Sequence, residues 1–334
     1  MEMESVIESK CEQLLLKACH FGASDIHLVP TEHNYAIMFR KYGRFIEAGE
    51  LPTEVASRMI SYFKFLSSLD ISEKRKPQSG SFQKQLQQFL FAFRISTLPS
   101  AFVKESLAIR LLRQNYALPL TSLCYSETAA QQLCSLVGHQ QGLILFTGAT
   151  GSGKTTSLYS LIHYCSNELA RHVISIEDPV ESSQNQLLQI QVNERAGVTY
   201  ATGLKAILRH SPDVIMIGEI RDRETARIAL EASLTGHLVL STIHAKDTVN
   251  CLYRLIDLGV TIEELRQTLI GVVAQTLVKK DDDRKALFEM LTDEHLGMAI
   301  DSTLQGELYS LPSSQTLQGQ LRRFGEMSYV PFSS

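Results

Sequence analysis

Tryptophan is absent from this 334-residue chain, and neither sign of charge dominates it, with 32 Lys and Arg against 36 Asp and Glu. The net charge of −4 argues against a protein whose main task is to coat nucleic acid, because such proteins carry an excess of basic side chains. No apolar run approaches the roughly 18 residues that a membrane-spanning helix needs. The acidic N-terminus is also unlike a secretory signal. We therefore expect a cytoplasmic protein.

Paired cysteines are also lacking. None of the six cysteines stands in a C-x-x-C pair, so their spacing supports neither a zinc site nor redox chemistry. A free cysteine behaves as a small hydrophobic residue, and we expect reduced, mostly buried thiols and no zinc. The six are Cys11, Cys19, Cys124, Cys134, Cys165 and Cys251.

What is present is ordinary globular composition, with 44% hydrophobic and 20% charged residues. At about 150 residues per domain, the length predicts two domains. Residues 1–113 combine helical and strand-like periodicity, which predicts a small α+β domain. The expected helices cover about 4–21 and begin near 53, and the expected strands are 26–29, 35–39, 89–96 and 108–112.

A different pattern follows an uncharged stretch at 114–125, which we interpret as a linker. Apolar strands at 143–147, 173–176, 214–217 and 238–242 alternate with helical stretches. That alternation predicts an α/β domain over 126–290, built on a parallel sheet covered on both faces. Beyond about 247 we expect helices at first, and we interpret 291–334 as a polar and helical tail.

A glycine-rich segment directly follows the strand at 143–147. The pattern G-x-x-x-x-G-K-[ST] is matched by Gly148-Ala149-Thr150-Gly151-Ser152-Gly153-Lys154-Thr155. Glycines let backbone N–H groups curl around phosphate oxygens, and the next helix presents its positive N-terminal end. Lys154 is expected to reach the β- and γ-phosphates, and the Thr155 hydroxyl to ligate Mg²⁺. The segment predicts a site for ATP and Mg²⁺.

Acidic residues follow two of the other predicted strands. Glu219 follows one strand, and the cluster Glu177-Asp178-Pro179-Val180-Glu181 follows another. Because the carboxyl ends of parallel strands meet at one edge of a sheet, we expect these groups beside the phosphates. One carboxylate for magnesium and one as a base would complete hydrolysis, but the spacing does not decide which does which. Acidic residues are also common in turns that end strands.

Two histidines, His237 and His244, flank the strand at 238–242. Their spacing is not that of a metal site, and H-E-x-x-H is absent. They are expected to face the γ-phosphate or a neighbouring subunit, or else to serve as ordinary hydrogen-bonding side chains.

Taken together, these segments resemble the ATPases of type II secretion, type IV pilus assembly and competence machines. The resemblance rests on a Walker A loop at 148–155, an acidic box at 176–181, a Walker B run at 212–222 and a histidine box at 235–244. It extends into the N-terminal part through Ala23-Ser24-Asp25-Ile26-His27, Leu69-Asp70-Ile71, Pro77-Gln78-Ser79-Gly80 and the run at 94–99.

The resemblance implies a RecA-like P-loop domain preceded by a smaller α+β domain, and a homo-hexameric ring in which each N-terminal domain lies on the next subunit. It implies that Glu219 binds Mg²⁺ through water and that Glu181 is the catalytic base. Arg94 and Arg110 resemble family arginines that reach the phosphates, although both also fit ordinary solvated strand positions. A polytopic inner-membrane platform protein is the implied partner, at the cytoplasmic face of the membrane.

Departures from the family pattern indicate which subfamily the chain resembles. The tetracysteine zinc loop of many members is replaced at 279–283 by Lys and Asp residues. The family's Q-R-L-V is Gln275-Thr276-Leu277-Val278 here, so threonine replaces the family's arginine at that position. The signature of pilus-retraction motors is missing near the C-terminus. The chain therefore most resembles the ATPases of Gram-positive competence pili.

The expected function is an ATP-hydrolysing motor that drives assembly of a pilus for DNA uptake. A type II secretion motor and a pilus-retraction motor of the same family are the alternatives. A DNA-acting P-loop ATPase is disfavoured by the acidic balance and the lack of Trp, so no direct nucleic-acid partner is expected. A non-catalytic, nucleotide-gated scaffold is disfavoured by the complete set Lys154, Thr155, Glu181 and Glu219.

Overall fold

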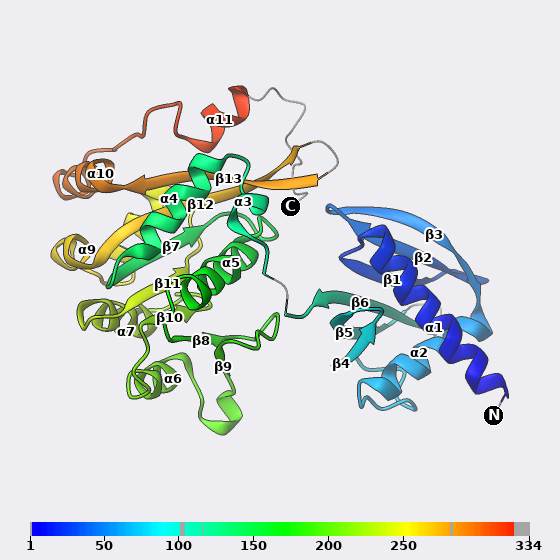
Figure 1. Cartoon of the computed structure of the whole chain (residues 1–334). Helices are drawn as coiled ribbons and strands as arrows, with labels where there is room; N and C mark the ends of the chain where they lie inside the picture. The colour runs from blue at the N-terminus through cyan, green and yellow to red at the C-terminus, as the bar shows by residue number, and fades with distance from the viewer. Residues whose placement is uncertain (1, 101–103, 116, 281–282, 324–334) are drawn as a thin grey trace. The chain divides into compact units, whose positions relative to one another are not determined.

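The computed structural model describes residues 2–100, 104–115, 117–280 and 283–323. The chain divides into two compact units, the first ending at residue 116 and the second beginning at 117 (Figure 1). None of the helices in the described ranges is both long and apolar enough to cross a membrane.

The first unit is a six-stranded antiparallel sheet with two helices on one face (Figure 1). The strand order is β3-β2-β1-β6-β5-β4. Ile26 of β1 pairs with Phe39 of β2 and Ile109 of β6, so one face of the sheet is apolar and packs on the helices. The elements are α1 (Glu2–Phe21), β1 (Asp25–Pro30), β2 (Asn34–Lys41), β3 (Arg44–Pro52), α2 (Thr53–Leu66), β4 (Gln78–Leu86), β5 (Phe89–Pro99) and β6 (Glu105–Arg113).

The second unit is a seven-stranded sheet in the order β13-β12-β7-β11-β10-β8-β9. All neighbouring strands are parallel except β12 and β13. Its strands are β7 (Gly142–Thr147), β8 (Val173–Glu177), β9 (Leu188–Gln191), β10 (Val214–Ile217), β11 (Leu238–Thr242), β12 (Leu269–Lys280) and β13 (Asp283–Thr292). Its helices are α3 (Leu120–Leu123), α4 (Glu127–Gly138), α5 (Lys154–Asn167), the 3₁₀ turn η1 (Glu194–Ala196), α6 (Tyr200–Ile207), α7 (Arg223–Leu234), α8 (Thr248–Asp257), α9 (Ile262–Thr268), α10 (Asp293–Gln305) and α11 (Leu317–Arg323).

Helices cover both faces of this sheet. Alternate residues of β7 point to opposite sides, so Leu143 and Leu145 join one core while Ile144 and Phe146 join the other. The first core contains side chains of α6 to α10, and the second contains those of α3, α4 and α5. The α/β fold class predicted from the sequence is confirmed.

The structure differs from the expected organisation in three segments. Within 114–125, Leu120, Leu123 and Cys124 are buried in the second unit's core, so this stretch is not a free linker. Helix α10 lies in the segment interpreted as a polar and helical tail, but it buries Leu296 and Ile300 in that core. The region after 247 contains the hairpin β12–β13 in addition to the expected helices.

Four of the six cysteines, Cys11, Cys124, Cys165 and Cys251, are buried. Burial raises the pKa of each of these thiols to about 12, because a thiolate is poorly solvated in an apolar core. They are therefore core side chains and not reactive groups at pH 7.

Candidate nucleotide site

The glycine-rich loop joins the carboxyl end of β7 to the first residue of α5, Lys154. Gly148, Gly151 and Gly153 have φ values of +139°, +78° and +88°, a region that other residues rarely adopt. The N-cap of α5 is Gly153, which has no side chain to occupy the first N–H groups of the helix. These N–H groups are left to bind an anion, as a phosphate cradle requires.

Strand β12 supports the loop from behind. The Gln275 side-chain Nε2 donates a hydrogen bond to the Ser152 carbonyl at 2.8 Å. A Cβ on Gly148 would lie 2.4 Å from the Gln275 carbonyl oxygen and 2.9 Å from Ser152 Oγ. The Oγ atom of Ser152 is buried and has no hydrogen-bond partner among the described residues. The loop is therefore packed closely against β12, with no room for a side chain at Gly148.

Gly148→Ala is expected to weaken nucleotide binding at least about tenfold. The added Cβ would meet the β12 backbone, and a φ of +139° costs alanine about 1–3 kcal/mol of strain. Binding of a fluorescent ATP analogue measures the effect. Gly138→Ala, in α4, is the matched control, since nothing lies within 4 Å of its added Cβ. Equal affinity of the two variants would contradict the role of the loop.

The side chain of Lys154 folds back onto the loop. Its Nζ donates to the carbonyl oxygens of Gly148 at 2.7 Å and Ala149 at 3.1 Å. Burial lowers the pKa of Lys154, while the negative charges of Glu219 and Glu181 act in the opposite direction. The acidic box and the Walker B run, both predicted to meet the loop, therefore each place a carboxylate within electrostatic range of Lys154.

Glu219 connects the Walker B run to the histidine box. Its Oε2 accepts a hydrogen bond from Arg221 Nε at 2.6 Å, and its Oε1 lies 3.0 Å from His244 Nε2. Only 13% of the Glu219 side chain is exposed, whereas 62% of His244 is. β10 and β11 are neighbours, and the Thr242 hydroxyl donates to the Gly218 carbonyl at 2.8 Å. The two boxes therefore form one hydrogen-bonded group at the carboxyl edge of the sheet.

The two glutamates of the acidic box have different environments. Glu177 is buried, and its carboxylate accepts hydrogen bonds from Tyr159 Oη at 2.5 Å, Ser175 Oγ at 2.7 Å and Gln189 Nε2 at 3.1 Å. Burial, followed by the Glu177 charge, raises the pKa of Tyr159. Glu181 is exposed and acts electrostatically on Lys154. Glu177 is thus occupied in holding the segment, whereas the Glu181 side chain is exposed.

The two histidines lie at opposite edges of the sheet. Leu238 pairs with Gly142 and Thr242 with Phe146, so His237 precedes β11 at the amino edge, about 16 Å from the carboxyl edge. Its Nδ1 lies 3.1 Å from the Ala232 carbonyl. The expectation that His237 faces a γ-phosphate is therefore wrong for the loop of its own unit, because the strand separates the two. Its other expected position, against a neighbouring subunit, stays a prediction.

Arg94 and Arg110 belong to the first unit, where they pair directly across β5 and β6. Their neighbours Phe93, Ile95 and Ile109 point into the core, so both arginines lie on the sheet face away from the helices. Arg110 Nε donates to Asp25 Oδ1 at 2.9 Å, and 57% of the Arg110 side chain is exposed. The sheet thus presents two cations side by side.

Comparison with known proteins gives the family. Residues 1–309 match the model of the family described as Type II/IV secretion system protein. The chain belongs to this family. The resemblance predicted from the sequence motifs is confirmed.

Within this family, the chain is similar to competence protein ComGA of Bacillus subtilis (strain 168), at 46% identity over 272 residues, covering 81% of this chain and 76% of that protein. It is 43% identical over 267 residues to type II secretion system protein E of Pseudomonas aeruginosa, covering 80% of this chain and 53% of that protein. Among solved structures, the pilus retraction motor PilT with bound ADP has a TM-score of 0.71 at 27% identity, covering 94% of this chain and 92% of that chain. The Legionella pneumophila ATPase DotB has a TM-score of 0.70 at 25% identity, covering 93% and 85%. These likenesses confirm the RecA-like fold.

Two residues of the site region were not predicted from the sequence. Gln275 supports the loop from β12, and Asp25 holds Arg110. Asp25 stands in a segment that carries the family resemblance and Gln275 in one that departs from it, and neither segment by itself shows a pairing between strands far apart in the chain. Their contacts follow from the sheet order, which places β12 beside β7 and β1 beside β6.

Proposed function

We propose that the protein hydrolyses ATP with Mg²⁺ and that hydrolysis drives assembly of a competence pilus used for DNA uptake. The observation that carries the hydrolytic part is the loop at 148–155, whose Lys154 lies in the field of Glu181 and Glu219. The similarity to ComGA over four fifths of the chain supports the biological part.

The proposed chemistry follows from where each side chain lies. Lys154 exchanges its two carbonyl contacts for phosphate oxygens, and the Thr155 hydroxyl and Glu219 would hold the metal. When bound, Mg²⁺ neutralises charge on the phosphates. Glu181 accepts the proton of the attacking water. The contact between His244 and Glu219 fixes the direction of the Glu219 carboxylate.

This function is tested by phosphate release from the purified full chain. Hydrolysis is expected to require Mg²⁺ and not to respond to added DNA, and loss of the gene is expected to abolish pili in the producing cell. Strong stimulation by DNA would favour a DNA-acting ATPase instead. Longer or more numerous pili on cells that lack the protein would favour a retraction motor.

Metal removal gives a further expected result. Chelation by EDTA should stop hydrolysis, and MgCl₂ alone should restore it, because the proposed metal is held by few protein groups and exchanges freely. No cluster of three or more His, Cys, Asp or Glu arranged for a metal occurs within the described ranges. Elemental analysis after dialysis is expected to give no stoichiometric zinc. A stoichiometric amount would overturn the expectation that the protein binds no metal other than Mg²⁺.

The proposed oligomer is a homo-hexameric ring bound to a polytopic platform protein at the cytoplasmic face of the membrane. Arg94 and Arg110 lie on one sheet face of the first unit, and an arginine supplied by a neighbouring subunit would stabilise charge on the transferring phosphoryl group. A closed ring gives every site such a neighbour.

Mixing two inactive variants tests this arrangement. The double variant Arg94→Ala, Arg110→Ala should bind ATP yet hydrolyse little, and Lys154→Ala should be inactive. A 1:1 mixture is expected to recover up to about a quarter of wild-type activity, the share of interfaces in a random ring that join an intact loop to intact arginines. No recovery after subunit exchange, verified by labelled subunits, would show that the arginines do not act between chains.

A further inference from the structure

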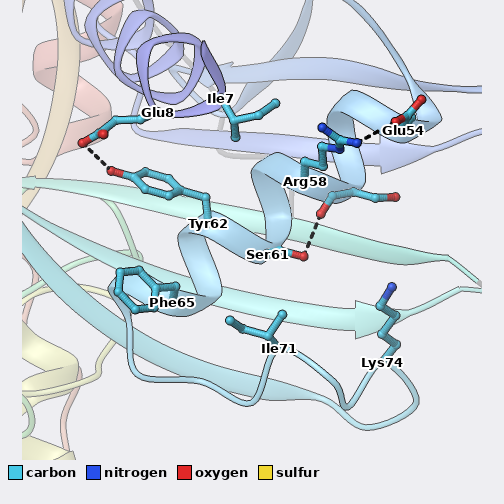
Figure 2. Close-up of a pocket in the computed structure, with 10 residues that line it drawn as sticks. Ile7, Glu8, Glu54, Arg58, Ser61, Tyr62, Phe65, Ile71 and Lys74 are labelled. Carbon is cyan, nitrogen blue, oxygen red and sulfur yellow. Dashed lines mark hydrogen bonds and ion pairs between the residues drawn. The ribbon is translucent and has the colours of Figure 1, made fainter. Parts of the chain in front are cut away.

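A hollow in the first unit is lined by residues of α1, of α2 and of the segment that follows α2 (Figure 2). Helix α1 contributes one wall, and the segment at 67–76, between α2 and β4, contributes the other. Its volume is about 1030 Å³. We call it the α1–α2 groove, and it is lined by Ile7, Glu8, Glu54, Ser57, Arg58, Ser61, Tyr62, Phe65, Ile71 and Lys74.

The segment that forms the second wall is held in place by hydrogen bonds from a buried lysine and from a glutamine at the start of β4. Lys64, fully buried, donates from Nζ to the Glu73 carbonyl at 2.7 Å and to the Glu105 carboxylate at 2.8 Å. The Gln78 amide donates to the carbonyls of Asp70 and Glu73, both at 2.9 Å, and accepts from the Asp70 N–H. The wall is therefore preformed, so an occupant does not have to order it.

Most polar groups of the groove already have partners within it. Figure 2 shows Arg58 paired with Glu54 at 2.9 Å and the Tyr62 hydroxyl bonded to Glu8 at 3.0 Å. The Ser61 hydroxyl bonds to the Ser57 carbonyl of its own helix. An occupant that relied on many hydrogen bonds, such as a polar small molecule, would have to break these contacts first.

What remains for an occupant is apolar surface and one charge. Phe65 is 66% exposed and Ile71 is 41% exposed, and both line the groove. Lys74 is exposed on the wall segment, and within the described ranges it makes no ion pair. The positive charge of Lys74 is thus not neutralised inside the groove.

The shape and charge fit a helix better than a flat surface. Arg58, Tyr62 and Phe65 follow one another at helical spacing along α2, the pattern with which one helix contacts another lying beside it. Glu8 and Glu54 on the lining disfavour an anionic membrane. We propose that the α1–α2 groove binds an amphipathic helix of a partner protein, with its apolar face on Phe65 and Ile71 and an acidic residue opposite Lys74.

Photo-crosslinking in pilus-producing cells identifies the occupant directly. With p-benzoylphenylalanine in place of Phe65, the expected adduct joins this chain to a helical segment of a different protein that carries Asp or Glu beside an apolar face. The same photo-reactive residue in place of Phe45, an exposed residue of β3 outside the groove lining, is the control and should not give that adduct. Adducts with another copy of this chain, with lipid, or with nothing would overturn the proposal.

A charge exchange tests the acidic contact. Lys74→Glu is expected to lower the adduct yield by up to about 5-fold, in the range of an exposed ion pair. Replacing the acidic residue of the identified segment with lysine should restore the yield in the Lys74→Glu chain and lower it in the wild type. Lys10→Glu makes the same charge change on α1 outside the groove lining and should leave the yield unchanged.

Basal ATP hydrolysis separates this proposal from the proposed function. The groove residues lie outside the nucleotide site, so Lys74→Glu should hydrolyse ATP at the wild-type rate and melt at the wild-type temperature. If the charge exchange fails while hydrolysis and melting remain normal, the groove proposal is overturned and the ATPase assignment stands.

Discussion

Hydrolysis of ATP by Lys154→Ala is expected to fall about 10²–10³-fold or more, the loss that follows removal of one preorganised cationic or hydrogen-bonding donor from a site of charge transfer. Lys154 is the cation inside the loop, and its ammonium group is held beside the carbonyls of Gly148 and Ala149. The loop would keep its glycines and its support from β12. Steady-state phosphate release at saturating ATP measures the loss.

Lys205→Ala is the matched control for this variant. Lys205 is exposed on α6, away from the loop, and loses the same side chain. We expect its rate to equal that of the wild type. Activity of Lys154→Ala close to that of Lys205→Ala would overturn the assignment of the loop.

The second large effect is expected from Glu181→Gln, which should still bind ATP but hydrolyse it about 10²–10⁴-fold more slowly, as loss of a general base does. Glutamine keeps the shape of the side chain and removes its ability to accept a proton. Affinity for a fluorescent ATP analogue and single-turnover hydrolysis, measured on the same sample, separate binding from chemistry.

Glu177→Gln is the informative comparison because it makes the same chemical change four positions away. Its amide NH₂ would face donors, since the Glu177 carboxylate accepts from Tyr159, Ser175 and Gln189. We expect a loss of about 1–3 kcal/mol in the free energy of unfolding, measured by denaturant titration, with a smaller loss of rate. A slow Glu177→Gln beside a nearly normal Glu181→Gln would exchange the two roles.

Much of the second unit could be predicted from the sequence because its strands are short apolar runs bounded by motifs. Strands β7, β8, β10 and β11 lie where the apolar segments predicted them. The carboxyl ends of parallel strands share one edge, so the loop, Glu219 and the acidic box were expected together. The pKa effect of Glu219 and Glu181 on Lys154 agrees with that expectation.

The hairpin β12–β13 could not be recognised in the same way. Val272 faces one core and Val273 the other, so β12 is buried on both sides and its sequence lacks the alternation that marks a half-buried strand. A continuous apolar run of this kind also fits a buried helix. Because the sequence does not identify β12 as a strand beside β7, it also does not predict that Gln275 supports the loop.

Distinguishing Glu177 from Glu181 needed the packing around them. Glu177 ends β8 and Glu181 follows it four residues later, so their spacing alone does not say which is the base. The difference arises because Glu177 is buried and accepts hydrogen bonds from Tyr159 of α5 and Gln189 of β9, whereas Glu181 is exposed. Such contacts depend on side chains brought from elements far along the chain, and a single sequence does not specify them.

A load applied along β13 would be carried by the whole β12–β13 ladder at once, because ten residue pairs join the two strands over their length. Shear of this kind distributes force over many hydrogen bonds, whereas peeling the strands apart would break them one after another. β12 in turn lies beside β7, and its Gln275 is bonded to the loop at Ser152. The edge of the sheet is therefore a stiff mechanical element, and tension along it would reach the phosphate cradle without passing through a flexible connection.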